Sequence, residues 1–354
     1  MNLIVTGGAG FIGSNLIRQA LKHKKYKILN LDKLTYASNL NSMKDLNSNP
    51  NYTFMKCDIC DYKLLEKTIF EFKPNKIIHL AAESHVDRSI ENSFSFIETN
   101  IIGTYNLLEI SKKYYVHLSS FEKKEFIFHH VSTDEVYGSL GINDKKFDED
   151  TSYKPNSPYS ASKASSDHLV RAWHKTYNLP TVITNCTNNY GPFQFPEKLI
   201  PLTILKCLSH ESIPIYGSGS QIRDWLYVED HADALLRILN KCKPGEIYNI
   251  GGNCERSNLQ VVEYICKILD KLSPSEKINN YSQLITFVED RPGHDKRYAM
   301  NINKIKKDYN WCPHETFESG MKKTIKWYLK NQDWILTATK KTYDLGRLGT
   351  YEEK

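Results

Sequence analysis

The chain has 354 residues, of which 40% are apolar and 25% are charged, and a formal net charge of +6 at pH 7. Such a composition is typical of a globular protein with a substantial core, arranged as about two domains or as one domain with a lobe. The positive charge is scattered in small groups such as residues 22–25, so it forms no basic block of the kind that binds nucleic acid, although it would suit a phosphate-bearing ligand.

Neither a leader peptide nor a membrane span is expected. The first apolar run starts at Leu3, and no later run approaches the roughly 20 residues of a membrane-spanning helix. The eight cysteines fit a disulfide framework poorly in a chain of this size. Cys57 and Cys60 form a C-x-x-C, but no second pair at ligand spacing accompanies them, and we expect no metal. These features predict a cytoplasmic protein with reduced thiols.

Short apolar runs alternate with amphipathic segments through the first half of the chain. Strands are predicted at residues 3–6, 27–31, 53–56, 76–80, 126–131 and 181–184. Helices are predicted near residues 12–22, 62–72, 97–115 and 158–177. Such alternation predicts a doubly wound α/β domain, in which a parallel sheet carries helices on both faces.

The alternation weakens after Cys186, where Gly and Pro are frequent. Helices are expected near residues 199–208, 229–240 and 259–272. We predict a first domain over residues 1–186, a smaller mixed α/β lobe over 187–335 and a polar tail over 336–354. An exchange of segments between the two parts is left open, and a cleft is expected between them.

The segment "TGGAGFIGS" directly follows the first predicted strand and leads into a helix. It satisfies G-x-G-x-x-G with Gly8, Gly10 and Gly13, and the wider G-x-x-G-x-x-G with Gly7. Glycines permit a tight turn and the close approach of backbone to a pyrophosphate, which then lies at the helix N-terminus. In this context the segment predicts a Rossmann-type dinucleotide site; a glycine-rich turn that serves packing only is the alternative.

Asp32 stands at the end of the second predicted strand, nineteen residues after Gly13. A carboxylate at this point accepts a hydrogen bond from the 2′-OH of the adenosine ribose and repels a 2′-phosphate, so NAD is favoured over NADP. The neighbouring Lys33 weakens this preference a little.

Tyr159 and Lys163 share one face of a helix that Ser157 and Pro158 are expected to start. A tyrosine with a pKa near 10 is a poor base at neutral pH, and lowering that pKa by three units needs about 4 kcal/mol of anion stabilisation. One charge-assisted hydrogen bond contributes about 1.5–3 kcal/mol. Lys163 alone is therefore insufficient, and we expect the positive nicotinamide of bound NAD⁺ to contribute. A chance surface pair on the helix is the alternative.

"VSTDEVYGS" ends a buried strand with two adjacent acids, Asp134 and Glu135. Strand pleating places residues 133 and 135 on one face, so Asp134 can join Thr133 and Glu135 only if the backbone leaves the strand near Thr133. A capping or turn cluster that opens a loop toward Gly138 is the alternative interpretation.

The chain resembles the nucleotide-sugar 4,6-dehydratases of the extended short-chain dehydrogenase/reductases, in particular those that act on dTDP-glucose. The resemblance is carried by "GGAGFIGS", "DKLTYASN", "HLAAESHVDRS", "STDEVYG", "YSASKASSDHLVRAW", "NNYGPFQFPEKLIP", "QIRDWLYVEDHADAL" and "DRPGHDKRYA". These motifs run from residue 2 to about residue 330. Ser38, where a glycine is expected in "TYAGN", is a minor departure.

The resemblance implies dehydration of dTDP-glucose to dTDP-4-keto-6-deoxyglucose, a step in deoxysugar (rhamnose-type) biosynthesis. Tyr159 would remove the proton of the 4-OH while NAD⁺ takes the C4 hydride, and Thr133 would bond the same oxygen. The resulting ketone acidifies the C5 hydrogen, so that Glu135 can act as base while Asp134 protonates the departing C6 hydroxyl. Return of the hydride to C6 makes the cycle redox neutral.

Binding residues also follow from the resemblance. The implied cofactor contacts are Gly7, Gly10, Phe11, Ile12, Gly13, Asp32, Lys33, Leu34, Thr35, Asp58, Ile59, Leu80, Ala81, Ala82, Ser84, Thr99, Tyr159, Lys163 and Asn189. The implied substrate contacts are Ser84, Thr133, Asn188, Lys198, Leu199, Pro214, Ile215, Tyr216, Arg223, Asn258, Asp290, Arg291 and His294. Arg223 is expected at the pyrophosphate, because a guanidinium fork matches phosphate oxygens; a surface ion pair with Asp224 is the alternative.

Several alternatives stay open. The nucleotide carrier can be dTDP, UDP or CDP, and a nucleotide-sugar 4-epimerase or decarboxylase of the same superfamily would share the fingerprint, Tyr159 and Lys163. A catalytically silent NAD-binding protein is a remote possibility. The family forms homodimers through helices that correspond to residues 97–115 and 158–177. The apolar positions Ile101, Tyr105, Leu108, Leu169, Trp173 and Tyr177 allow this, but core packing explains them equally.

Overall fold

The computed structural model describes residues 1–290 and 293–339. Its centre is a seven-stranded sheet in the order β10-β6-β5-β4-β1-β2-β3, with every neighbouring pair parallel. The strands are β1 (Asn2–Thr6), β2 (Lys27–Asp32), β3 (Tyr52–Lys56), β4 (Lys76–His79), β5 (Ile127–Thr133), β6 (Thr181–Cys186) and β10 (Ile247–Ile250). The predicted parallel sheet is therefore confirmed.

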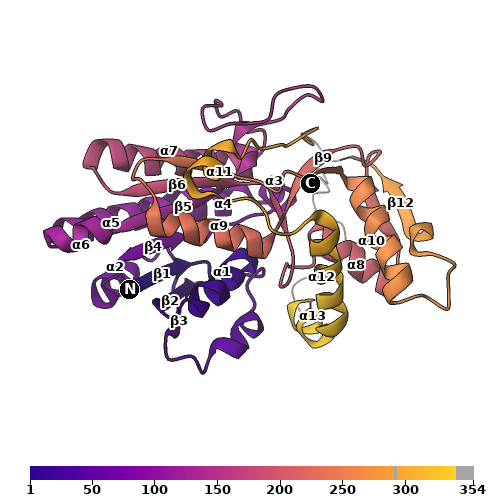
Figure 1. The fold of residues 1–354 in the computed structure, drawn as a ribbon, viewed down its shortest axis with the longest axis horizontal. Coiled ribbons are helices and arrows are strands. Elements are labelled where there is room, and N and C mark those ends of the chain that lie inside the picture. Colours follow the sequence, from indigo (N-terminus) through magenta and orange to yellow (C-terminus); the bar gives the residue numbers. More distant parts are fainter. Residues whose placement is uncertain (291–292, 340–354) are drawn as a thin grey trace.

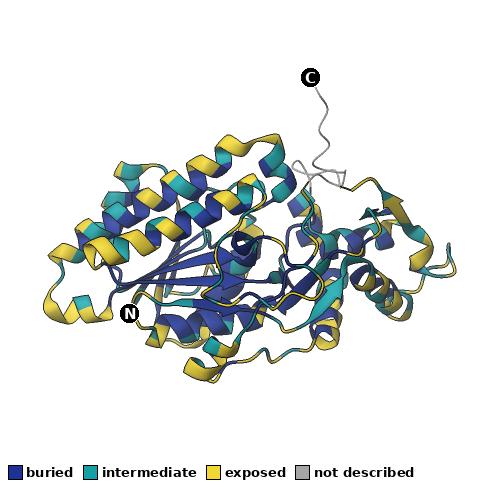
Figure 2. Cartoon of the chain, turned by 90° about the horizontal axis from the view of Figure 1, so that it is seen from above, coloured by how far each residue is buried: buried dark blue, intermediate teal, exposed yellow. Residues whose placement is uncertain are grey.

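Helices cover both faces of this sheet (Figure 1). One face packs against α1 (Phe11–Lys22) and α9 (Val228–Lys241), and the other packs against α2 (Tyr62–Phe72), α5 (Thr104–His117) and α7 (Pro158–Tyr177). The side chains of β1 alternate, since Leu3 and Val5 join the first core cluster and Ile4 joins the second. Figure 2 shows the buried strands between helices whose outer faces are exposed. The sheet is thus a Rossmann-type layer buried on both sides.

A second lobe lies beyond the carboxyl ends of the strands (Figure 1). It contains a three-stranded sheet, β11-β9-β7, a two-stranded sheet, β12-β8, and its own apolar core. Its elements are β7 (Asn188–Tyr190), α8 (Leu199–Ser209), β8 (Ile213–Tyr216), β9 (Ile222–Tyr227), β11 (Glu255–Ser257), α10 (Asn258–Leu272), η4 (Tyr281–Leu284), β12 (Ile285–Val288), α12 (Phe317–Lys330) and α13 (Gln332–Thr339).

The two parts exchange segments. After β7, α8, β8 and β9 the chain returns to the first part, where α9 packs on α1 and β10 pairs with β6. It then goes back to the lobe with β11 and α10. The other short elements are η1 (Leu40–Leu46), α3 (Val86–Glu91), α6 (Ser120–Glu125), η3 (Asp134–Tyr137) and α11 (Asn303–Tyr309). The chain therefore crosses between the parts several times.

Two predicted elements differ from the structure. The single helix predicted over residues 97–115 is divided into the π-helical η2 (Ile97–Gly103) and α5, and the short helix α4 (Ser93–Phe96) directly precedes η2. Helix α13 extends to Thr339, with Trp334, Ile335 and Ala338 buried, so residues 336–339 of the predicted tail are helical. Residues 340–354 lie outside the described residues.

No helix in the described part of the chain combines the length and apolar character that crossing a membrane requires. The order of the strands reverses at β1, which has β2 on one side and β4 on the other. Ligands of such sheets bind outside the carboxyl ends of the strands at this reversal. A ligand-binding site is therefore expected at the carboxyl end of β1.

Candidate active site

The turn after β1 leaves no room for side chains. Gly7 has a φ of +73°, and a Cβ at this position would lie 2.6 Å from the backbone nitrogen of Ala81. A Cβ at Gly13 would clash with the carbonyl oxygen of Gly7. Helix α1 begins after Gly10, which brings no side-chain acceptor to the first-turn N–H groups. Since backbone donors at a helix start attract phosphate, this cradle fits the diphosphate of NAD.

Three donors hold the carboxylate of Asp32 at the end of β2. Its Oδ2 accepts from the backbone nitrogen of Ala9 at 3.0 Å, and its Oδ1 accepts from that of Leu34 at 2.8 Å and from Ser38 Oγ at 2.9 Å. Burial raises the pKa of Asp32, and these donors oppose the shift. Ser38, the departure from the family's glycine, therefore supplies one of the bonds that orient this carboxylate.

Lys33 connects the end of β2 to two other walls of the same pocket. Its Nζ donates to Thr99 Oγ1 on η2 at 2.9 Å and lies 3.5 Å from Glu83 Oε1, after β4. The side chain of Lys33 is thus held across the adenosine end of the pocket.

One pocket gathers most of the predicted cofactor residues. It is lined by Gly7, Gly10, Phe11, Ile12, Gly13, Asp32, Lys33, Thr35, Ile59, Leu80, Ala81, Ala82, Ser84, Thr99, Tyr159, Lys163 and Asn189. Two predicted residues do not line it: Leu34 contributes its backbone nitrogen to Asp32, and Asp58 accepts from the backbone nitrogen of Cys60 at 2.9 Å. The arrangement accommodates a dinucleotide that extends from Asp32 to Lys163.

The two adjacent acids follow the last residue of β5. The strand ends at Thr133, whose Oγ1 accepts from the backbone nitrogen of Glu135 at 3.3 Å and caps the 3-10 turn η3. The backbone therefore leaves the strand where the sequence requires it, and Thr133, Asp134 and Glu135 all line the cofactor pocket. The capping alternative describes Thr133 correctly, but it does not exclude a second role for the acids.

Asp134 is only 2% exposed, and its Oδ2 has no hydrogen-bond partner in the described part of the chain. Burial raises the pKa of Asp134 well above its usual range, and the charge of Glu135 raises it further, while Arg223 opposes the shift. These influences favour the neutral form of Asp134 beside a second carboxyl group, which is the pairing that acid–base chemistry needs.

Helix α7 positions Tyr159 and Lys163. Ser157 caps the helix in a capping box with Ser160, and Pro158 occupies its first turn, as predicted. Lys163 Nζ donates to the carbonyl oxygen of Val131 on β5 at 2.9 Å.

The protonation state of Tyr159 depends on its surroundings. Burial raises the pKa of Tyr159 well above its usual range, and Glu135 raises it further, while the hydrogen bond with Thr133 opposes the shift. The protein alone therefore leaves Tyr159 protonated, and an additional positive charge is needed to make it a base.

A second pocket opens toward the lobe, and it shares with the first the residues Ser84, Glu135, Asn188, Asn189, Gln194, Glu197 and Lys198. It brings together the predicted substrate residues Ser84, Asn188, Lys198, Leu199, Pro214, Ile215, Tyr216, Arg223, Asn258 and His294. Thr133 lines the cofactor pocket instead. Asp290 lies outside both linings, with its Oδ1 2.6 Å from His294 Nδ1. Arg291 lies outside the described residues.

Arg223 and Asp224 are both buried, so the surface ion pair considered above is wrong. The Arg223 guanidinium donates to the carbonyl oxygens of Ile222 at 2.8 Å and of Asp295 at 3.0 Å, and lies 4.3 Å from the ring centroid of Tyr298. These contacts fix its planar group at the wall of the second pocket.

Three residues that no sequence prediction covers form a cluster between the pockets. Glu197 accepts from Arg88 Nε at 2.9 Å and from the Tyr36 hydroxyl at 3.1 Å, and the Arg88 guanidinium lies 3.7 Å from the centroid of the Tyr36 ring. We call this the Tyr36–Arg88–Glu197 cluster. All three residues lie in the motifs "DKLTYASN", "HLAAESHVDRS" and "NNYGPFQFPEKLIP", which are the signal that could have identified them.

Other lining residues outside the predicted set are Cys57, His85, Ser132, Gln194, Phe195 and Trp225. All eight cysteines are free thiols, and the described residues contain no group of three His, Cys, Asp or Glu side chains able to hold a metal. His129 and His130 are fully buried in β5, in agreement with strand packing.

The fold and the site define an NAD-dependent enzyme of the short-chain dehydrogenase/reductase type. The family model described as GDP-mannose 4,6 dehydratase matches residues 4–324, so the chain belongs to this family of nucleotide-sugar dehydratases.

The chain aligns with relatives from this family over nearly the whole length of both proteins. The chain is 53% identical to the dTDP-glucose 4,6-dehydratase of Neisseria meningitidis, over 98% of this chain and 99% of that protein. The dTDP-glucose 4,6-dehydratase of Bacillus anthracis, solved with NAD, is 46% identical with a TM-score of 0.84, covering 96% of this chain and 100% of that one. That of Streptomyces venezuelae, solved with NAD and TYD bound, is 39% identical with a TM-score of 0.87, at the same coverage.

Proposed function

We propose that the chain dehydrates dTDP-glucose to dTDP-4-keto-6-deoxyglucose with a bound NAD, as a step in deoxysugar biosynthesis. The observation that carries the proposal is the pair of carboxyl groups at the end of β5, where the buried Asp134, whose pKa burial raises well above its usual range, stands next to Glu135 in the pocket of Tyr159 and Lys163. A 4-epimerase or decarboxylase of the same superfamily does not need such a pair. The names of the relatives support dTDP-glucose as the substrate.

The residues of the chain take the following roles. The glycine turn, Asp32 and Lys163 hold the NAD, which when bound supplies a reversible hydride acceptor and a positive charge. Tyr159 takes the proton of the sugar 4-OH, with Thr133 bonded to the same oxygen.

The elimination then uses the two acids. Glu135 removes the proton at C5, which the 4-ketone has acidified, and Asp134 gives its proton to the departing C6 hydroxyl, so water leaves across C5 and C6. Arg223 holds the pyrophosphate, because a guanidinium fork matches phosphate oxygens.

Incubation with dTDP-glucose in D₂O tests the reaction. We expect a 4-keto-6-deoxy product that carries solvent deuterium at C5, identified by mass spectrometry and NMR. A 4-epimer without deuterium at C5 would instead establish the epimerase alternative, and no turnover with dTDP-, UDP- or CDP-glucose would establish a silent NAD-binding protein. Parallel reactions with the three substrates identify the carrier.

A Glu135→Gln variant tests the role of the acid pair. Because a carboxamide cannot accept the C5 proton, product formation is expected to fall by about 10²–10⁴-fold. The NAD content of the purified variant should be unchanged. Glu71→Gln on the exposed face of α2 is the matched control. Undiminished product formation by a folded, NAD-containing Glu135→Gln variant would contradict the mechanism.

We also propose that the enzyme works in the cytoplasm as a homodimer formed through η2, α5 and α7. Ile102, Tyr105 and Tyr177 are exposed large apolar residues on these helices, and the Tyr105 ring contacts Trp173 in an edge-on arrangement with centroids 5.9 Å apart. Leu108, which the spacing places on the same face, is instead fully buried. Analytical ultracentrifugation should give twice the monomer mass for the wild type and the monomer mass for Ile102→Glu/Tyr105→Glu. A monomeric wild type would contradict this assembly.

A further inference from the structure

Lys163 carries its charge in a buried position. The residue is 4% exposed, and its Nζ donates to the Val131 carbonyl oxygen at 2.9 Å and lies 3.4 Å from His130 Nε2. An ammonium group in such a position is costly without an opposite charge, and burial lowers the pKa of Lys163. The proposed role of Lys163 requires the protonated form, so a compensating negative charge must lie near its ammonium group.

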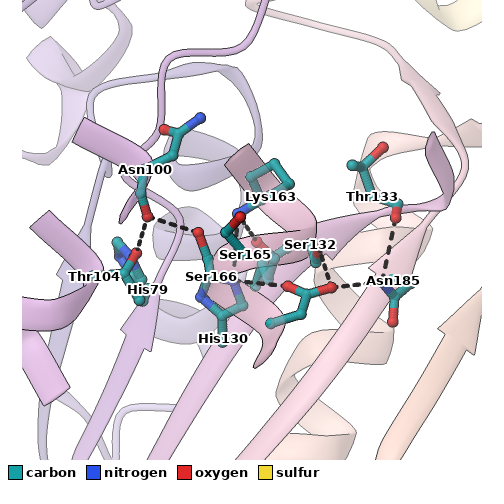
Figure 3. A network of polar contacts seen from close by, with 12 residues as sticks. His79, Asn100, Thr104, His130, Ser132, Thr133, Lys163, Ser165, Ser166 and Asn185 are labelled. Atoms are coloured by element: carbon teal, nitrogen blue, oxygen red, sulfur yellow. Dashed lines mark hydrogen bonds and ion pairs between the residues drawn. The ribbon is translucent and has the colours of Figure 1, made fainter. Parts of the chain in front are cut away.

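Asp167 lies one turn further along α7 and is 2% exposed. Its Oδ2 accepts from Ser132 Oγ at 2.8 Å, from the Tyr153 hydroxyl at 2.9 Å and from Asn185 Nδ2 at 3.2 Å. Its Oδ1 lies 3.1 Å from His130 Nε2. Figure 3 shows His130, Ser132, Lys163 and Asn185 directed toward one another between β5, β6 and α7. Several donors that converge on one carboxyl group favour its ionised form.

His130 lies between Lys163 and Asp167, and its Nε2 makes both contacts. Burial lowers the pKa of His130 well below its usual range, so the ring is neutral. A neutral imidazole nitrogen either accepts or donates, so Nε2 can accept from Lys163 or donate to Asp167, but it cannot do both at once. His130 is therefore an uncharged ring between the two side chains, and it supplies no charge that balances Lys163.

Among the described residues, no other group near Lys163 supplies the negative charge. His79 from β4 is held neutral by burial, and burial raises the pKa of the Cys186 thiol on β6 to about 12. Tyr159 on α7 is protonated in the protein alone. Burial raises the pKa of Asp167 to about 6, with Lys163 and the three donors opposing, so Asp167 is ionised at neutral pH. Among the described groups that face Lys163, Asp167 is thus the anion.

We propose that Asp167 is the buried counter-ion that keeps Lys163 protonated, and that it acts as a positioning residue for the catalytic pair Tyr159 and Lys163. This role rests on the proposed function, because it explains how the lysine of that site retains its charge. Asp167 acts through Lys163 and is not assigned a contact with the substrate.

Asp167→Asn removes the charge and keeps the shape. With its oxygen toward Ser132, Tyr153 and Asn185, the amide keeps the acceptor of these three bonds and turns its nitrogen toward His130. Without the counter-ion Lys163 should lose its proton at lower pH. We expect the alkaline limb of kcat against pH to move down by about 1–2 pH units and kcat at neutral pH to fall by about tenfold or more. The NAD content should stay as in the wild type. Asp230→Asn, a buried carboxylate at the start of α9, is the matched control and should leave the profile unchanged.

Tyr153→Phe is the second variant and does not depend on the folding of Asp167→Asn. Loss of the Tyr153 hydroxyl removes one bond to the ionised carboxylate, so Asp167 should take up its proton at higher pH. We expect the acid limb of the kcat profile to move up by about one pH unit. An unchanged acid limb in a folded Tyr153→Phe variant would overturn the proposal.

Titration of Lys163 by ¹³C NMR separates this role from the reaction itself. In protein with labelled lysine, assigned by Lys163→Arg, the midpoint of Lys163 should be lower in Asp167→Asn than in the wild type, without any substrate present. Equal midpoints would overturn the role of Asp167. A lowered midpoint in a protein that does not turn over dTDP-glucose would sustain the counter-ion and refute the proposed function.

Discussion

At the scale of single residues, the site contains a carboxyl group that does not stabilise the fold. Asp134 is buried beside Glu135, and its Oδ2 has no hydrogen-bond partner in the described part of the chain. A buried charge without a partner is strongly unfavourable, so the group takes a proton instead. Residues that function requires in such positions commonly reduce stability, and Asp134 is expected to be one of them.

The free energy of unfolding of Asp134→Asn should increasingly exceed that of the wild type as pH rises. The pKa of Asp134 in the folded protein lies above its value in the unfolded chain, which is about 3.9. The folded state therefore binds more protons in this window, and the wild-type free energy of unfolding decreases as pH increases from about 4. The free energy of unfolding of the variant does not undergo this decrease, because the variant has no carboxyl group at position 134. The difference in unfolding free energy in its favour should grow by at most about 1.4 kcal/mol per pH unit, measured by urea denaturation at several pH values.

The same variant should lose activity, because an amide has no acidic proton for the C6 hydroxyl. Asp150→Asn, an exposed carboxylate, serves as the control and should follow the wild type in both measurements. A stability difference for Asp134→Asn that is constant from pH 4 to pH 8 would show that the carboxyl group titrates normally.

At the scale of elements, the Tyr36–Arg88–Glu197 cluster joins segments that are far apart in the sequence. Tyr36 follows β2, Arg88 lies on α3 and Glu197 precedes α8. Glu197 lines both pockets and its side chain is only 1% exposed, so its ion pair with Arg88 is shielded from solvent. Removal of one partner of a shielded pair leaves the other uncompensated, which makes such pairs sensitive to substitution.

Glu197→Gln is expected to release NAD. Since the cluster holds the segment after β2 against the segment before α8, the neutral amide should loosen the wall of the cofactor pocket. We expect a lower NAD content after purification and an NAD dissociation rate that increases by about tenfold or more, measured by release of the bound nucleotide. Glu211→Gln, which breaks the exposed pair with Lys206, is the matched control. Wild-type retention of NAD in Glu197→Gln would contradict the role of the cluster.

Sequence patterns are sufficient to predict some of the helices and strands but not others. Apolar periodicity predicted six of the seven strands of the central sheet, all except β10, and most of the helices of the first part, because each of these elements buries a regular face. It could not predict η2, whose π-helical turn depends on tertiary hydrogen bonds. The Asn100 carbonyl oxygen accepts from Thr104 Oγ1 and from Ser166 Oγ, each at 2.6 Å (Figure 3). Asn100 Nδ2 donates to Ser162 Oγ on α7 at 2.8 Å. Ser162 and Ser166 are distant from Asn100 in sequence and leave no periodic signal.

The site was predictable to the extent that its residues follow strand ends. Gly7, Asp32 and Thr133 close β1, β2 and β5, and their positions in a parallel sheet determine that they meet. The counter-ion Asp167 could not be predicted in this way. It belongs to the pattern of a helix interior, and only the packing of α7 on β5 and β6 brings His130 and Asn185 to its carboxylate.

At the scale of the whole molecule, the domain boundary predicted after Cys186 follows a change in the sequence pattern, but residues beyond it still belong to the first part of the fold. Residues 228–250 return to the first part as α9 and β10. Helix α9 buries Leu235, Leu236 and Leu239 in the same core cluster as Leu16 and Ile17 of α1. Burial of each such side chain contributes about 1.5–3 kcal/mol, so the loss of α9 alone would remove a large part of a typical domain stability of about 5–15 kcal/mol.

A chain that ends after Cys186 is therefore expected not to fold. It would retain the glycine turn, Tyr159 and Lys163, but it would expose the face of α1 that α9 covers and leave β6 as an unpaired edge. Circular dichroism should show no cooperative thermal transition, and NAD should not bind in a direct titration. Coexpression of residues 187–354 is the matched control, since it supplies α9 and β10 from a second chain and should restore NAD binding. Cooperative unfolding and NAD binding by residues 1–186 alone would show that the first part is an independent domain and that the returning segment is dispensable.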